Sequence, residues 1–249
     1  MIILKGGALL LACLLALFSA IGIFEFYRMA LPEREAESRL AALTGASLLF
    51  APFAAGDPLL MTGMGLLFLV FALLFLFRIR DITDAAREVS YAMLGFIYIP
   101  FMLAHLVMLR QTQFGVQWLI VIMLIVMSND SAAYYIGCAF GRRKLYPLVS
   151  PKKSMEGALG GLAGSICGTL LAKFTFFEQL SLADALVTAV IIGMLGQVGD
   201  LFESLLKRSF GVKDSGTIFP GHGGMLDRLD SILFAAPATY YYVIYFFNG

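Results

Sequence analysis

Long apolar stretches alternate with short polar ones along most of the chain. A helix needs roughly 20 apolar residues to cross about 30 Å of hydrocarbon. Eight stretches approach that length, at residues 6–27, 38–55, 58–78, 90–109, 115–139, 156–176, 183–205 and 229–247. The pattern therefore predicts an all-α, polytopic membrane protein with about eight transmembrane helices. The first stretch resembles a signal peptide in length, but its single preceding lysine and lack of a small-residue cleavage site favour a retained span.

Lysine and arginine residues are concentrated in alternate connections of this arrangement. Fifteen of the 18 lie in or beside the first, third, fifth and seventh connections, and three lie on the other side. The positive-inside rule then predicts that the odd connections face the cytoplasm and that both termini lie outside. This segregation supports the count of eight spans. The two long polar connections, the fifth and the seventh, lie on the cytoplasmic side, so we expect the active site to face the cytoplasm. For a short chain without a targeting extension, a bacterial inner membrane is the expected location.

The composition narrows the protein class further. Hydrophobic residues make up 60% of the chain and charged residues 14%, whereas a soluble domain is about half apolar and a quarter charged. This composition argues against a soluble enzyme, a secreted disulfide scaffold and a disordered tail. The net charge of +1 gives no basic excess for nucleic acid. Cys13, Cys138 and Cys167 lie in apolar runs without metal-site spacing, so we expect small buried side chains.

The first polar interruption lies late in the fifth span, at residues 128–131. Asp130 follows Asn129 there, and a carboxylate inside a membrane costs a few kcal/mol unless it is paired or hydrated. A helix that simply ends at Met127 is the alternative, but the chain from 132 to 140 is apolar again. We therefore favour a functional role for this segment.

The second interruption precedes the sixth span, at residues 150–157. Pro151 stops a helix and Ser154 is suited to cap the next one. Lys152 and Lys153 would attract phosphates at a membrane surface. Taken alone, the segment also fits a positively charged membrane anchor followed by a cap.

The third interruption lies at the cytoplasmic end of the seventh span. Asp200, Glu203, Ser204 and Lys207 recur at the spacing of one helix face. We expect this face to point into the bundle or a water-filled cleft. Ordinary solvation of a helix end is the alternative.

The seventh connection is the fourth and richest polar segment. Its glycines permit close approach of the backbone to a phosphate, and the start of the last span is expected to offer free N–H groups to an anion. Asp227 and Asp230 lie one turn apart at that start. They suit helix caps, but caps alone do not require His222 or the lysines and arginines nearby.

These residue types point to one kind of chemistry. Carboxylates without a cysteine or histidine cluster suit a hard cation such as Mg²⁺, which takes much of its shell from water and substrate phosphates. Lysines and arginines suit a polyphosphate, and the chain has no Walker A run. The sequence predicts a metal-and-cation clamp on a nucleotide or phospholipid. His105, alone in the fourth span, is expected to be a satisfied interior residue, and the glycines of the sixth span to serve close helix packing.

The seventh connection resembles the signature of the phosphatidate cytidylyltransferases, also called CDP-diacylglycerol synthases. The matching positions are Ser204, Leu206, Lys207, Arg208, Lys213, Asp214, Gly216, Phe219, Pro220, His222, Gly223, Gly224, Met225, Asp227, Arg228, Leu229 and Asp230. Residues 150–157 look like a second family block, with Ser154 where threonine is usual. Asn129 and Asp130, with Tyr134 and the Gly141–Arg142 pair, look like a third.

The resemblance covers residues 115–235 well, whereas the first four spans match only as apolar helices. We therefore expect a single integral-membrane domain, 1–249, in which 115–235 is the catalytic core and 1–110 supplies N-terminal membrane helices. The chain is somewhat short for the family.

The family implies that CTP and phosphatidate give CDP-diacylglycerol and pyrophosphate, with Mg²⁺ and a possible companion K⁺, in a membrane homodimer that binds no nucleic acid. Carried onto this sequence, the metal ligands are Asp200 and Asp227. The expected catalytic residues are Asp200, Lys207, Arg208, Lys213, Asp214, His222, Asp227, Arg228 and Asp230. The expected substrate-binding residues are Asn129, Asp130, Tyr134, Arg142, Ser150, Lys152, Lys153, Glu156, Gly223 and Gly224.

Three other functions remain open on the sequence. A CTP-dependent nucleotidyltransferase or phosphotransferase with another lipid acceptor is the nearest. In an ion-coupled transporter, Asp130 and Asp200 would be ion sites, but the charged residues gather at one face without continuing across the membrane. A purely structural membrane protein leaves the seventh connection unexplained.

Overall fold

The structure is a computed structural model that describes residues 6–55, 57–78, 81–218 and 223–247. Its contacts divide the chain into two compact units. Unit 1 comprises Met1–Met108 and Asp214–Arg228, and unit 2 comprises Leu109–Lys213 and Leu229–Gly249. The described part of the signature loop, which we define as residues 214–218 and 223–226, therefore packs with the N-terminal helices.

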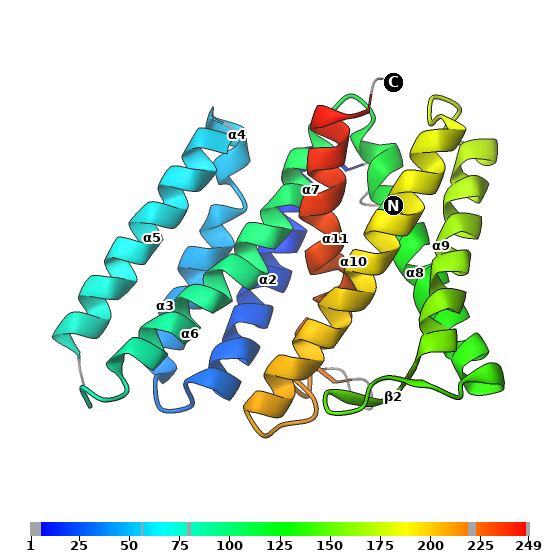
Figure 1. The fold of residues 1–249 in the computed structure, drawn as a ribbon. Helices are drawn as coiled ribbons and strands as arrows, with labels where there is room; N and C mark the ends of the chain where they lie inside the picture. Colours follow the sequence, from blue (N-terminus) through cyan, green and yellow to red (C-terminus); the bar gives the residue numbers. More distant parts are fainter. Residues whose placement is uncertain (1–5, 56, 79–80, 219–222, 248–249) are drawn as a thin grey trace. The chain divides into compact units, whose positions relative to one another are not determined.

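Unit 1 is helical (Figure 1). Its elements are α2 (Ala8–Ala30), α3 (Glu35–Leu48), α4 (Ala51–Ala55), α5 (Asp57–Phe77), α6 (Ala85–Phe96), the π-helical turn η1 (Ile97–Phe101) and most of α7 (Met102–Arg110). The predicted span 38–55 is broken into α3 and α4. Pro52 lies in the first turn of α4, where its missing N–H is tolerated, but it cannot continue the helix before it.

A buried arginine joins the helix ends of unit 1. Arg34 is 2% exposed, and its guanidinium donates to Glu88 at 2.6 Å and to Glu37 at 3.3 Å. Nη1 of Arg34 also donates to the carbonyl oxygen of Arg78 at 2.9 Å. The α2–α3 and α5–α6 connections therefore lie at the same end of the unit, as the alternation of basic loops predicts. In the sequence, Arg34 is only one of the basic residues of the first connection.

Unit 2 contains three long helices that run side by side (Figure 1). Its elements are α8 (Gly115–Phe140), β1 (Lys144–Tyr146), β2 (Ser150–Ser154), α9 (Met155–Thr175), α10 (Leu182–Ser209) and most of α11 (Leu226–Tyr245). Strands β1 and β2 form an antiparallel hairpin in which Lys144 faces Ser154 and Tyr146 faces Ser150. Over the described residues, the fold is therefore all-α except for this small hairpin, which lies in the fifth connection, where Pro151 prevents a helix.

The glycines of α9 allow it to lie directly against α8. A Cβ atom at Gly160 would lie 2.5 Å from the side chain of Ile136. At Gly164 and Gly168 it would meet the backbone and hydroxyl of Ser128, at 2.5 and 2.6 Å. The prediction of close helix packing through small residues is confirmed. His105 is fully buried and its Nδ1 lies 2.9 Å from the Phe101 carbonyl, which confirms the interior role expected of it.

Within the part of the chain that the structure describes, five of the helices are long and apolar enough to cross a membrane, which indicates an integral membrane protein. They are Ala8–Ala30, Ala85–Arg110, Gly115–Phe140, Met155–Thr175 and Leu182–Ser209. Large apolar side chains also lie on the outer surface, such as Phe68 (53% exposed) and Leu159 (64% exposed). A soluble protein rarely exposes so much apolar surface, but lipid tails accept it.

The expectation of buried cysteines is wrong. Cys13, Cys138 and Cys167 are free thiols with exposed side chains. The physical reason is that in a membrane protein an apolar run need not face the protein interior, because its outer face packs against lipid.

Candidate active site

An amide network fixes α8, α9 and α10 to one another. Asn129, 3% exposed, donates through Nδ2 to Ser165 Oγ at 2.8 Å and to the Gly193 carbonyl at 3.3 Å. Its Oδ1 accepts from Gln197 Nε2 at 3.0 Å, and the same Nε2 donates to the Ala158 carbonyl at 2.9 Å. Buried amides of this kind are costly unless paired, so the network specifies how the three helices meet. Asn129 was expected to bind substrate; here its amide holds helices together.

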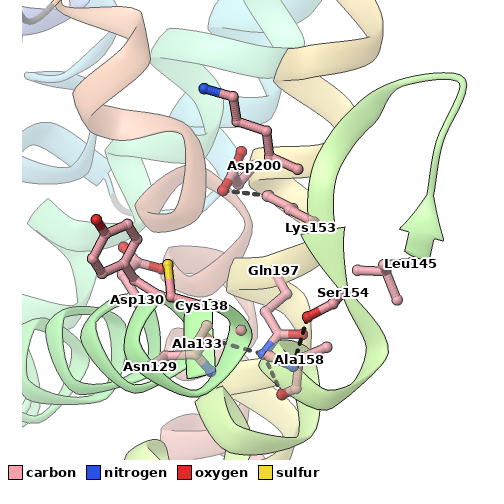
Figure 2. A pocket seen from close by; sticks show the side chains of 14 residues that line it. Asn129, Asp130, Ala133, Cys138, Leu145, Lys153, Ser154, Ala158, Gln197 and Asp200 are labelled. Atoms are coloured by element: carbon pink, nitrogen blue, oxygen red, sulfur yellow. Dashed lines mark hydrogen bonds and ion pairs between the residues drawn. The ribbon is translucent and has the colours of Figure 1, made fainter. Parts of the chain in front are cut away.

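A cavity of about 380 Å³ opens beside this network, within unit 2 (Figure 2). It is lined by residues of α8, the hairpin region, α9 and α10. They are Asn129, Asp130, Ala133, Tyr134, Gly137, Cys138, Leu145, Lys152, Lys153, Ser154, Gly157, Ala158, Gln197 and Asp200. We call this cavity the unit 2 pocket. It brings together five of the expected substrate residues with Asp200.

An ion pair crosses the unit 2 pocket. Lys153, on β2, pairs through Nζ with the Asp200 carboxylate on α10 (Figure 2). Both side chains remain accessible, at 29% and 30% of their surface. Asp130 lines the same pocket from α8, and the charges of Asp130, Asp200 and Asp230 repel one another while Lys153 offsets them. The pocket therefore carries both charge types in reach of a ligand.

The hairpin is anchored by short polar contacts at its base. Ser154 Oγ accepts from the Gly157 amide at 3.1 Å, which confirms the predicted cap of α9. Glu156 accepts from the backbone amides of Arg142 and Arg143 at 3.0 and 3.2 Å. These contacts fix the strand that carries Lys153. Glu156, Arg142 and Ser150 were expected to bind substrate, and none of the three is among the residues lining the unit 2 pocket.

The polar face of α10 is divided between two environments. Asp200 lines the pocket, whereas Glu203 is 1% exposed and pairs with Lys207, itself 12% exposed. Further along, Arg208 is exposed and donates to the Val212 carbonyl at 3.3 Å. Lys207 thus serves to neutralise a buried carboxylate.

Asp230 lies in α11, close to α10. Its Oδ1 accepts from the Ser231 amide at 2.6 Å. The close approach of the helices requires Gly199, because a Cβ there would lie 2.5 Å from the Asp230 carbonyl oxygen. Among the described residues, no group of three or more His, Cys, Asp or Glu side chains is arranged to hold a metal by itself.

The signature loop of unit 1 is organised around two carboxylates. Asp227 Oδ2 accepts from the Ser215 amide at 3.0 Å, from Ser215 Oγ at 2.8 Å and from the Gly224 amide at 2.7 Å. Glu25 of α2 accepts from the amides of Met225 and Leu226, both at 3.0 Å. The prediction that these N–H groups await a ligand anion is wrong, because two carboxylates of the chain already occupy them.

The remaining predicted residues of the seventh connection lie in or beside the signature loop. Gly223 has a φ of +83°, a conformation that favours glycine, and Gly224 is buried against Glu25. Lys213, Asp214 and Arg228 have exposed side chains. The prediction for His222 lies outside the described residues.

Glu25 is the residue that sequence reasoning missed. It lies in the first apolar span, which contains none of the predicted site residues. The available signal was the rule already applied to Asp130: a carboxylate within a membrane helix needs a partner.

Comparison with known proteins gives the chain a clear set of relatives. The model of the cytidylyltransferase family matches residues 1–246. The phosphatidate cytidylyltransferase of Bacillus subtilis is 40% identical over 162 residues, which is 64% of this chain and 60% of that protein. The phosphatidate cytidylyltransferase of Thermotoga maritima is 35% identical over 182 residues, 71% of this chain and 67% of that protein. The uncharacterized protein YnbB of Escherichia coli is 39% identical over 203 residues, 80% of this chain and 63% of that protein. The matched part thus spans about three fifths to two thirds of these relatives.

Proposed function

The chain belongs to the cytidylyltransferase family, and on that premise we propose that it transfers the CMP moiety of CTP to phosphatidate. The products would be CDP-diacylglycerol and pyrophosphate. The observation that carries the proposal is the unit 2 pocket, in which Lys153 and Asp200 meet at the hairpin end of three apolar helices. A cavity with both charge types at the end of membrane helices suits a reaction between a nucleotide and a lipid phosphate.

The proposed step forms one bond and breaks one. A phosphate oxygen of phosphatidate attacks the α-phosphorus of CTP, and the bond from that phosphorus to the bridging oxygen of pyrophosphate breaks. The attacking phosphate is already an anion, so no strong general base is needed. The difficulty is bringing two anions together, and positioning with charge neutralisation supplies the catalysis.

Lys152 and Lys153 are the cations best placed to draw a phosphate into the unit 2 pocket. Lys153 would exchange its carboxylate partner for a phosphate oxygen as the ligand enters. Arg208, Lys213 and Arg228 have exposed side chains, and we propose that they offset charge on the triphosphate and the departing pyrophosphate. Lys207 would contribute chiefly through Glu203, with which it pairs.

The donor set of the pocket fits Mg²⁺. Asp200 and Asp130 supply carboxylate oxygens, and the Asp200 carboxylate already attracts a cation, the Lys153 ammonium. We propose Asp200 as a magnesium ligand. Asp227 is proposed as a second, through Oδ1, because Oδ2 accepts three hydrogen bonds. When bound, Mg²⁺ would neutralise phosphate charge and orient the triphosphate. A companion K⁺, a homodimer and a cytoplasm-facing site complete the proposal.

A label-transfer assay tests this function. The purified chain in detergent would receive phosphatidate, Mg²⁺ and CTP labelled on the cytidine. We expect label to enter the organic phase only when phosphatidate is present, and Asp200→Asn to abolish the transfer. Asp184→Asn is the matched control, since Asp184 lies in the first turn of the same helix and contacts Ser181 and Tyr242 instead.

Two outcomes would contradict the proposal. Absence of organic-phase label from folded protein, across several acyl chains of phosphatidate, would redirect the assignment to another acceptor lipid and then to transport. An active Asp200→Asn variant with unchanged Mg²⁺ dependence would remove Asp200 from the metal site.

A further inference from the structure

Glu25 contacts the signature loop through both carboxylate oxygens. Oε1 accepts from the Met225 amide at 3.0 Å. Oε2 accepts from the Leu226 amide at 3.0 Å and lies 3.2 Å from Ser215 Oγ. The side chain is 4% exposed, so these groups replace the water that a carboxylate would otherwise require.

The glycines of the loop show how closely this carboxylate is enclosed. A Cβ at Gly216 would collide with Oε1 of Glu25, and one at Gly224 would lie 2.5 Å from Oε2. Two of the glycines that mark the family signature therefore make room for a side chain from a helix near the other end of the sequence. The carboxylate and the loop are shaped to each other.

The contacts identify Glu25 as an anion held by the protein. Two backbone N–H groups at the start of α11 point at its oxygens, and a helix N-terminus favours negative charge. Donors aimed at both oxygens would repel a metal ion there. Glutamine cannot replace the carboxylate, because its NH₂ group would face an amide N–H.

Asp227 connects this anchor to the proposed chemistry. Ser215 Oγ lies 3.2 Å from Glu25 Oε2 and 2.8 Å from Asp227 Oδ2, so the two carboxylates share one hydroxyl. A shift of Ser215 or of the amides at 224–226 would move Asp227 as well. A displacement of about 1 Å at a catalytic group is enough to cost on the order of 10²-fold in rate.

We propose that Glu25 is a positioning residue, which holds Ser215, Met225 and Leu226 so that Asp227 keeps its place in the reaction. The inference rests on the proposed function for its catalytic consequence. Its structural part, the anchoring of the loop by α2, stands on the contacts alone.

The test compares Glu25→Gln with Glu37→Gln. Glu37 is a buried carboxylate of the same unit, 5% exposed, and it pairs with Arg34 and Arg78 rather than with the loop. Hydrogen–deuterium exchange of the peptide containing Met225 and Leu226, the melting temperature, kcat and the KM for CTP would be measured for both variants and the parent protein. Ser215→Ala, which removes only the shared hydroxyl, serves if Glu25→Gln does not fold.

We expect Glu25→Gln to raise amide exchange at Met225 and Leu226 by about tenfold or more, because these amides lose a hydrogen bond to a charged acceptor. It should lower kcat by about 10²-fold with a much smaller change in KM. Glu37→Gln should lower the melting temperature without either effect. Ser215→Ala should show a smaller loss of the same kind.

Two results would overturn the inference: unchanged exchange at Met225 and Leu226 in Glu25→Gln, or a fall in kcat in Glu37→Gln as large as that in Glu25→Gln. If the parent protein transfers no label to any lipid, the proposed function fails. The exchange comparison then still decides whether Glu25 anchors the loop.

Discussion

The unit 2 pocket and the signature loop of unit 1 both depend on carboxylates, but the neighbours of those carboxylates differ. Asp200 faces a cavity and pairs with the side-chain ammonium of Lys153. Glu25 is enclosed by backbone amides of the chain. Asp227 combines both kinds of role. Its Oδ2 accepts three hydrogen bonds within the loop, and its Oδ1 is the proposed magnesium ligand.

The two carboxylates differ in the groups that donate to them, which are backbone amides for Glu25 and a lysine side chain for Asp200. Backbone amides are fixed in position, so a carboxylate bound to them becomes part of the framework. A lysine side chain rotates easily and can give up its partner to an incoming phosphate. A family signature therefore mixes residues that meet the ligand with residues that shape the loop, and only the surroundings of each distinguish them.

The largest expected effect concerns Asp227, which both accepts hydrogen bonds that shape the loop and is proposed to bind magnesium. Asp227→Asn keeps one oxygen for the Gly224 amide but loses the charge that a magnesium ion needs. We expect turnover to fall by at least about 10²-fold with the melting temperature little changed. Label transfer and thermal unfolding in detergent would measure the two quantities. A variant that keeps normal turnover and magnesium dependence would assign Asp227 to the framework alone.

The next effect concerns the exchangeable partner in the pocket. Lys153→Met removes the cation and leaves Asp200 without it, so we expect label transfer to fall by about 10- to 100-fold, as a loss of about 1.4 to 2.7 kcal/mol of transition-state stabilisation would give. Lys173→Met is the control, because Lys173 lies in the last turn of α9 and donates to the Leu180 carbonyl. Equal losses in the two variants would show that the pocket lysine has no special role.

A smaller effect separates the conformation of the loop from its packing. Gly211 and Gly223 both have positive φ, at +74° and +83°. Nothing lies within 4 Å of a Cβ at Gly211, whereas one at Gly223 would lie 2.5 Å from Asp227 Oδ2. Gly211→Ala should cost about 1–2 kcal/mol of stability, and Gly223→Ala about 1–3 kcal/mol more. Equal free energies of unfolding in Gly211→Ala and Gly223→Ala would mean that the close approach of Gly223 to Asp227 does not contribute to stability.

The smallest effect is a pH dependence at Glu37. Burial acts to raise the pKa of Glu37, but hydrogen bonds to the backbone and Arg34 outweigh it, with attraction from Arg34 and Arg78, and the pKa is lowered. Because the pKa is lower in the folded protein, the ionised Glu37 side chain stabilises the fold at pH values above its ordinary pKa of 4.5. This stabilisation is lost as the pH falls through the lowered pKa. Acidification should therefore narrow the difference in melting temperature between the parent protein and Glu37→Gln. A constant difference would contradict this assignment.

The sequence anticipated most of the helices, because apolar length decides them, but among the described residues five helices rather than the eight predicted are long and apolar enough to span a membrane. It also located Asp130, Lys153 and Asp200 as exceptions to the apolar pattern, and the structure brings these three into one pocket. It did not anticipate the hairpin, whose strands are too short to show an alternating pattern, nor the break at Pro52.

The partners of buried carboxylates were beyond the reach of sequence patterns. Glu25 meets backbone amides 200 and 201 residues away, and those amides look the same whatever residue carries them. Glu88 likewise finds Arg34 across 54 residues. Local spacing identifies charges that share a helix face, but it does not show which distant backbone turns toward them.

The bond between Glu25 and Leu226 also sets an order of events in biogenesis. The ribosome adds about 5–20 residues per second, so α2 would wait roughly 10–40 s after synthesis before its partner exists. During that time the carboxylate near the end of α2 must find water or lipid headgroups. A chain that stops before Leu226 would lack this closure, so the contact between α2 and the signature loop would form only after the start of α11 is made.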